Sequence, residues 1–203
     1  MPPSGRNPTY PCCADLPSQL WLYMFVAIDR TSKFAFVELH REAKQRTAGD
    51  FLRRLIEAVP YKIHTLLTDN GIHFTTPGAG GSAVPLIRKA LANGELFRAH
   101  AFELACAQAS IDHQTTKPKH PWTNGQVERM NRTIKDATVK RHHYESHEQL
   151  ERHLADFVSA YNFGRRLKTL KGLTPYEFVC KRWRTEPEKF RLDPIHQMPR
   201  LNI

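Results

Sequence analysis

The chain has 203 residues, enough for one domain with a normal hydrophobic core. Its formal net charge is +10 and its pI about 9.7, which favours a polyanionic partner, because neutralising phosphates releases condensed counterions. No apolar run approaches the roughly 20 residues that span a bilayer, and the N-terminus lacks a signal-peptide pattern. Composition therefore excludes a membrane protein and predicts a cytoplasmic one. The four cysteines lack CxxC spacing, which excludes a zinc ribbon and a disulfide framework.

In the first half of the chain, the sequence pattern predicts a β-hairpin, then a helix, then a further strand. Residues 1–19 carry five prolines and no periodicity, so an irregular segment is expected. Two apolar runs, 20–28 and 34–39, flank a polar turn and predict a β-hairpin. An amphipathic helix over 47–59 and a strand over 63–68, ending at Asp69, follow. The glycine-rich segment 72–96 is expected to be a loop, either a mobile flap or an idle insertion, with room for a short helix over 86–91.

The second half is predicted to be mainly helical. A helix over 97–109 and a short edge strand over 111–116 lead to the segment KPKHPWTNGQVERMNR at 117–132. There Thr123 and Gln126 form a capping-box pattern, which predicts a helix start. Apolar residues then recur at helical spacing: Val127, Met130, Ile134 and Ala137. Further helices are predicted to follow the N-caps Ser146 and Thr174, each with a capping-box partner three residues later.

Two carboxylates stand at positions that suit chemistry. Asp69 ends a strand, where ligand sites of α/β sheets gather, although Asp-Asn-Gly is also a common turn. Glu128 lies in the first turn of a helix, and an ion pair with Arg132 at i+4 is the alternative. Carboxylates that converge in a basic chain can hold Mg²⁺, a hard ion that prefers oxygen ligands and usually shares them with phosphate.

Four segments resemble the integrase core of insertion-sequence transposases: LYMFVAIDRTSKFAFVEL, LLTDNGIHF, TKPKHPWTNGQVERMNRTIK and YNFGRRLKTLKGLTPYEF. The resemblance runs from about Leu20 to the C-terminus. It implies an α/β, ribonuclease-H-like mixed sheet flanked by helices, with a catalytic core at 20–180 between an irregular segment at 1–19 and a basic tail at 181–203. Asp69 matches the second acid of the family's DDE triad, and Glu128 matches the third.

The resemblance also implies an activity. The expected function is DNA integration and transposition by metal-dependent DNA strand cleavage and strand transfer. Mg²⁺ or Mn²⁺ would be held by Asp69 and Glu128, with two ions if a third acid is present. The expected partners are element ends, target DNA and further copies of the chain, without a membrane. Six basic residues are candidates to bind DNA phosphates, which positions DNA without reading its sequence: Lys119, Arg129, Arg132, Lys135, Arg165 and Arg166.

The first acid of the triad is not evident in the sequence. In the family it lies on a strand ahead of the hairpin in an H-x-D context, and that position falls near Pro11, where no H-x-D stands. Asp15 and Asp29 are poorly placed candidates. We therefore expect a missing or degenerate first strand, an N-terminally truncated copy, and weak or absent activity. A non-catalytic DNA-binding remnant of a transposase is the alternative. A ribonuclease-H-type nuclease is a third interpretation, which the NGQVER and LTPYEF segments disfavour.

Overall fold

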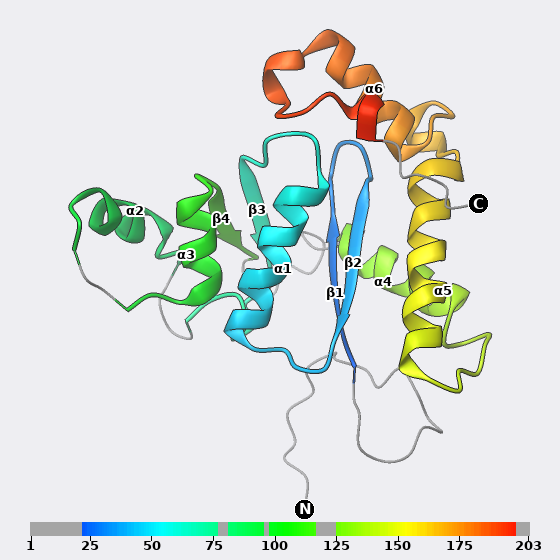
Figure 1. The fold of residues 1–203 in the computed structure, drawn as a ribbon, viewed down its shortest axis with the longest axis horizontal. Helices are drawn as coiled ribbons and strands as arrows, with labels where there is room; N and C mark the ends of the chain where they lie inside the picture. The colour runs from blue at the N-terminus through cyan, green and yellow to red at the C-terminus, as the bar shows by residue number, and fades with distance from the viewer. Residues whose placement is uncertain (1–21, 77–80, 96–97, 117–124, 198–203) are drawn as a thin grey trace, which may run out of the picture.

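The computed structural model describes residues 22–76, 81–95, 98–116 and 125–197 (Figure 1). The irregular segment expected at 1–19 lies outside these residues, whereas the strands and helices expected between 22 and 185 are confirmed with small shifts at their ends. No helix in the described ranges is long and apolar enough to cross a bilayer. The elements are β1 (Tyr23–Ile28), β2 (Ala35–His40), α1 (Gln45–Ala58), β3 (Thr65–Thr68), α2 (Val84–Ala92), α3 (Ala101–Gln108), β4 (Asp112–Thr115), α4 (Gly125–Ala137), α5 (His147–Ser159) and α6 (Pro175–Thr185).

The expected β-hairpin is formed by β1 and β2, which pair in antiparallel register from Tyr23↔His40 to Ile28↔Ala35. Its turn is held by Asp29. The Asp29 carboxylate accepts hydrogen bonds from the backbone N–H groups of Thr31 and Ser32, both at 3.0 Å, and from the Ser32 hydroxyl at 2.5 Å. The Asp29 carboxylate therefore stabilises the turn, which is a common role for Asp at this position.

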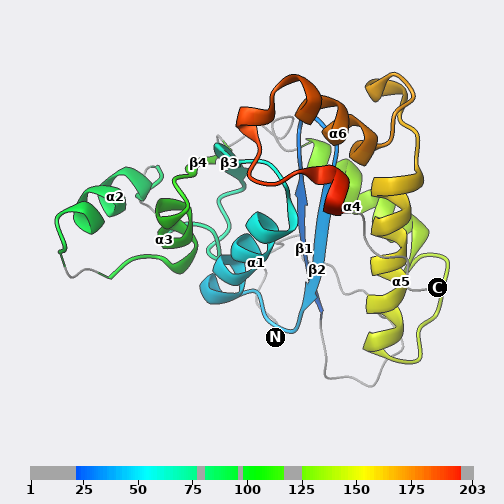
Figure 2. The same ribbon diagram turned by 45° about the horizontal axis from the view of Figure 1, so that its top comes forward.

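Helices cover both faces of the hairpin (Figures 1 and 2). On one face Phe25 packs against Phe51 of α1, with ring centroids 5.4 Å apart, in a cluster that includes α3. On the other face, Met24 and Val26 pack against a cluster that contains Met130 of α4 and a leucine of α5. Burial on both faces explains why β1 reads as a continuous apolar run rather than as an alternating one. Each large apolar side chain buried here contributes about 1.5–3 kcal/mol.

The strands of the described residues form two small sheets. β1 pairs only with β2 there, and β3 pairs with β4 in parallel, from Thr65↔Asp112 to Thr68↔Thr115. The sequence predicted one mixed sheet whose first strand is missing or degenerate. In the described ranges the sheet is in two parts, and β1 and β3 each have one edge that no strand pairs. Helix α1 packs against β1, β2 and α3 and so joins the two parts (Figure 1).

The described part of segment 72–96 is ordered by a helix. α2 buries Val84 and Ile87 against α3, and Arg88 forms an ion pair with Asp112 at 2.9 Å. Both views place α2 at the end of the molecule farthest from the hairpin (Figures 1 and 2). The short helix expected over 86–91 is therefore longer, and it forms a packed extension of α3.

Two capping boxes were predicted in the described second half, and one is complete. The Thr174 hydroxyl accepts from the Glu177 N–H at 3.1 Å, and the Glu177 carboxylate accepts from the Thr174 N–H at 2.9 Å. At α5 the Ser146 hydroxyl accepts from the Gln149 N–H at 3.2 Å, but the Gln149 side chain accepts from Glu145 instead. The box expected at Thr123 includes a residue outside the described ranges, and the Gln126 side chain accepts from Lys33 at 3.3 Å.

The segment after α6, whose role the sequence left open, returns to the C-terminal end of α1. The Arg191 guanidinium donates to the backbone carbonyls of Ile56 and Val59, the latter at 2.8 Å. Tyr61 and Phe190 form a β-bridge, and their rings lie 6.1 Å apart. A cation that bonds the last carbonyls of a helix satisfies acceptors that have no partner within the helix. The tail therefore fastens the end of α1.

A buried asparagine joins the end of α5 to the hairpin. Asn162 lies in a short π-helix (Ala160–Gly164) and is 3% exposed. Its Oδ1 accepts from the Ala35 N–H at 2.9 Å, and its Nδ2 donates to the Ala35 carbonyl at 2.8 Å. The side chain thus replaces a neighbouring strand at the first residue of β2.

We predict that Asn162→Ala lowers the free energy of unfolding by about 2–4 kcal/mol, because it removes two hydrogen bonds and leaves the Ala35 N–H and C=O buried without partners. Chemical denaturation measures the change. Asn93→Ala is the matched control, since Asn93 bonds Glu95 on the surface, and it should shift stability by less than about 0.5 kcal/mol. Equal effects of the two substitutions would contradict this role of Asn162.

Candidate active site

Asp69 follows the last residue of β3 and is exposed. Its Oδ1 accepts from the Gly71 N–H at 3.0 Å, so the Asp-Asn-Gly turn forms as its composition predicts. The Asn70 amide donates to the Thr116 carbonyl at 2.9 Å and fixes the turn to the end of β4. The second carboxylate oxygen of Asp69 has no hydrogen-bond or ion-pair partner within the described ranges. Asp69 therefore serves the turn and still offers an oxygen to a ligand.

His73 lies beside this carboxylate. A Cβ on Gly71 would lie 2.9 Å from Asp69 Oδ1 and 2.7 Å from His73 Cε1, so both side chains crowd the same point. The His73 ring packs against Phe74, with centroids 4.2 Å apart, and against Phe25 at 5.7 Å. Burial lowers the pKa of His73, although the nearby Asp69 carboxylate opposes the shift. A neutral imidazole therefore faces the candidate acid at neutral pH.

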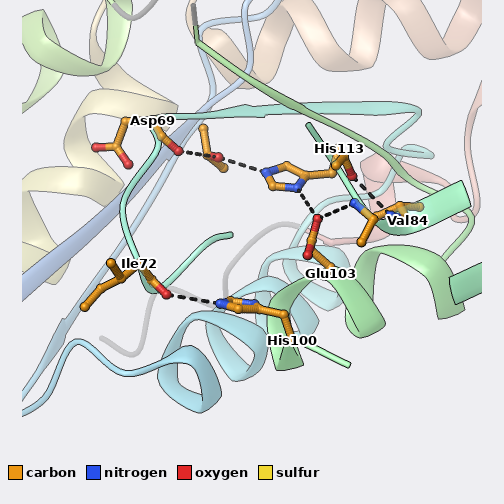
Figure 3. A network of polar contacts seen from close by, with 9 residues as sticks. Asp69, Ile72, Val84, His100, Glu103 and His113 are labelled. Carbon is orange, nitrogen blue, oxygen red and sulfur yellow. Dashed lines mark hydrogen bonds and ion pairs between the residues drawn. The ribbon is translucent and has the colours of Figure 1, made fainter. Parts of the chain in front are cut away.

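Behind Asp69 lies a buried polar network (Figure 3). The Thr68 hydroxyl is 2.9 Å from the Asp69 carbonyl oxygen and 2.8 Å from His113 Nε2. His113 Nδ1 lies 3.7 Å from Glu103 Oε1, and that oxygen accepts from the Ala83 N–H at 2.7 Å. Sequence reasoning missed Glu103 and His113. The available signal was an acid between Phe102 and Leu104 in a helix with few other polar residues.

Glu128 lies in the first turn of α4 and is exposed. Within the described ranges, no cation is within 4.0 Å of its carboxylate, so the alternative of a Glu128–Arg132 ion pair is not formed. Met130 and Ile134 of the same helix are buried, as predicted, whereas Val127 and Ala137 are half-buried. The apolar side of α4 thus holds the helix on the hairpin, and Glu128 remains available to a ligand.

The carboxylates of Asp69 and Glu128 are the type of ligand that Mg²⁺ prefers. Asp69 and Glu128 offer exposed carboxylate oxygens that no cation among the described residues pairs with, and a hard divalent ion prefers such ligands. No group of three His, Cys, Asp or Glu side chains within the described ranges is placed to hold a metal ion. Of the two candidates for the first acid, Asp29 is employed in the hairpin turn, and Asp15 lies outside the described residues. Within the described part of the chain, Asp69 and Glu128 therefore remain the two candidate metal ligands.

The candidate DNA-binding cations differ in their surroundings. Arg129 and Arg132 are exposed on α4, next to Glu128 in sequence, and Lys135 is half-buried on the same helix. Arg165 is exposed, with its guanidinium 5.8 Å from the centre of the Tyr161 ring. Arg166 donates to the Gly172 carbonyl at 3.0 Å and lies 3.5 Å from the Glu177 carboxylate, so it also supports the loop before α6. Lys119 lies outside the described residues.

Two family models, both described as integrase core domain, match residues 9–121 and 109–175. The first match begins ahead of Leu20 and includes Asp15. The chain is 26% identical over 118 residues to an uncharacterized protein of Caenorhabditis elegans, an alignment that covers 58% of this chain and 7% of the relative's length. The chain therefore spans only a small part of this curated relative.

Solved structures of retroviral integrases have a similar fold. The catalytic core of BIV integrase gives a TM-score of 0.58 at 23% identity, covering 82% of this chain and 91% of that one. A chain of the simian T-cell lymphotropic virus intasome in complex with PP2A regulatory subunit B56 gamma gives 0.59 at 19% identity, covering 91% of this chain and 51% of that one. The HTLV-2 integrase catalytic core, in complex with magnesium, gives 0.56 at 18% identity, covering 78% and 85%. The expected ribonuclease-H-like α/β fold is therefore confirmed.

We predict that Gly71→Ala destabilises the protein by about 1–3 kcal/mol, because the new methyl group must displace His73 or the Asp69 carboxylate. Thermal or chemical denaturation measures the loss. Gly81→Ala is the control, since a Cβ there meets nothing within 4 Å, and it should be neutral or stabilising by up to about 1 kcal/mol. A Gly71 variant as stable as the Gly81 variant would contradict the close approach.

Proposed function

Because the chain belongs to the integrase core domain family, we propose that it acts in metal-dependent DNA strand cleavage and strand transfer. One observation carries this proposal. Asp69 at the end of β3 and Glu128 at the start of α4 are both exposed, and neither carboxylate is paired with a cation within the described ranges. Carboxylates with only a structural role would be expected to form the ion pairs that neighbouring arginines offer.

The proposed chemistry is phosphoryl transfer on DNA. Water attacks a phosphodiester at the end of the mobile element, and the freed 3′-hydroxyl then attacks a phosphodiester of the target. Asp69 and Glu128 would hold Mg²⁺ or Mn²⁺, which supplies activation of the attacking oxygen and stabilisation of the leaving oxygen. The protein's part is to orient the two carboxylates. The bond from Gly71 to Asp69 and the packing of α4 on the hairpin support that orientation.

Arg129 and Arg132 are proposed to bind the DNA backbone. Both are exposed on the helix that carries Glu128, so a phosphate bound there would lie near the candidate acids. The net charge of +10 favours such contacts. We also propose that the chain works as a homo-oligomer, because similar integrases are described as a trimeric form and as part of an intasome.

A non-catalytic DNA-binding role is the second candidate function. This function is favoured because the described ranges contain only two candidate acids, and no group of three His, Cys, Asp or Glu side chains there could hold a metal ion. The two functions differ in their need for Asp15, which the family match includes and which is the remaining candidate for a first acid. A divalent ion held by two carboxylates is less well neutralised than one held by three, so weak activity is expected of two acids alone.

In a strand-transfer assay with Mn²⁺, we predict weak activity for the full chain and none for Asp69→Asn or Glu128→Gln. Asp50→Asn is the control, because Asp50 pairs with Arg53 on the surface of α1, and it should retain the activity of the unaltered chain. Loss of activity in Asp15→Asn would identify Asp15 as the missing first acid of the triad. Activity that survives Glu128→Gln would contradict the proposed site, and complete inactivity of the unaltered chain would favour the DNA-binding alternative.

We predict that Arg132→Ala weakens DNA binding about equally for different sequences and reduces the slope of log affinity against log salt by about 1. Fluorescence anisotropy over a salt series measures both effects. Arg53→Ala removes the same charge from α1, where Arg53 already pairs with Asp50 at 2.6 Å, and should leave the slope nearly unchanged. Equal slopes for the two variants would place the DNA elsewhere.

A further inference from the structure

The network behind Asp69 buries an acid and an imidazole that the proposed chemistry does not use. The side chains of His113 and Glu103 are 0% and 1% exposed. Burying such groups costs several kcal/mol unless partners offset the loss of water. Their partners connect four parts of the chain, namely the start of α2, helix α3, strand β4 and the end of β3 (Figure 3). The network therefore ends at the backbone of the candidate metal ligand.

The direction of the hydrogen bonds follows from counting protons. The Asp69 carbonyl can only accept, and the Thr68 hydroxyl has one proton to donate. Both short contacts of Thr68 Oγ1, 2.9 Å to the Asp69 carbonyl and 2.8 Å to His113 Nε2, are hydrogen bonds only if Thr68 donates to Asp69 and accepts from the Nε2–H of His113. The Nε2–H of His113 therefore orients the hydroxyl that holds the Asp69 peptide. In this tautomer Nδ1 carries no proton, and it makes no hydrogen bond to Glu103, whose Oε1 lies 3.7 Å away.

Independent contacts hold the residues on both sides of Asp69. The Thr116 N–H donates to the Thr68 carbonyl at 2.9 Å, and the Asn70 amide donates to the Thr116 carbonyl at 2.9 Å. The carbonyl of Ile72 lies 3.1 Å from Nε2 of His100, which is 8% exposed at the start of α3. The Asp69 carboxylate itself receives only the Gly71 N–H within the described ranges. The Gly71 N–H thus ties the carboxylate to the turn that follows β3.

We propose that Thr68 and His113 are positioning residues that hold the Asp69 carboxylate in the orientation needed to bind a divalent cation, an inference that rests on the proposed function of Asp69. Partners of this kind, which act through a ligand rather than on the ion, typically change metal affinity 10–100-fold when removed.

The test uses the full chain and two readouts. Mn²⁺ affinity is measured by the electron paramagnetic resonance signal of the free ion, and hydrogen exchange of the Gly71 amide is measured by NMR. Thr68→Val removes the hydroxyl at nearly constant volume, and Thr68→Ser keeps it. We expect Thr68→Val to weaken Mn²⁺ binding at least 10-fold and to speed Gly71 exchange by a similar factor, whereas Thr68→Ser stays within about 3-fold of the unaltered chain in both.

Two controls separate positioning from general loss of structure. The Ala35 amide, which bonds Asn162, should exchange at the same rate in every variant. His113→Gln retains an N–H donor and should resemble Thr68→Ser, whereas His113→Leu should resemble Thr68→Val. Unchanged Gly71 exchange and Mn²⁺ affinity in Thr68→Val would overturn the proposal. If the unaltered chain binds no Mn²⁺, the proposed function of Asp69 fails, and the positioning role is then decided by Gly71 exchange alone.

Discussion

Burial of the β1–β2 hairpin on both faces places the two candidate acids. On one face, Phe25 contacts Phe74, which follows the turn that contains Asp69. On the other face, the hairpin packs against Met130 and Ile134, which lie on the helix that begins just before Glu128. Each acid is exposed, but each belongs to a segment whose apolar side chains are fixed by the same two strands. The position of each acid therefore depends on the packing of the core.

The interior also contains polar contacts that apolar packing alone would not explain. Glu103, His113 and Thr68 are buried, and their partners run from the start of α2 to the carbonyl of Asp69. Such a network is costly in an apolar interior unless its members are bonded, but a bonded network is directional. Backbone pairing joins β3 to β4, and the contact between Thr68 and His113 then links the side chains of the two strands next to Asp69.

Polar side chains hold the second half of the chain to the first in a similar way. Asn162 bonds both backbone groups of Ala35, and Arg191 bonds the last carbonyls of α1. Arg166, a candidate for DNA contact, bonds Gly172 and lies near the carboxylate of the α6 capping box. These contacts satisfy backbone groups at the ends of strands and helices, where regular structure leaves them without partners.

The sequence by itself determined the local elements and the two acids. Periodicity and capping patterns located the hairpin, α1, α5 and α6, because helix and strand periods are properties of neighbouring residues. A strand end and a helix start marked Asp69 and Glu128. Tertiary structure alone decided the division of the strands into two sheets, the burial of Glu103 with His113 and the bonds of Asn162. These features depend on partners far apart in the sequence, whereas periodicity indicates only which side of an element is buried.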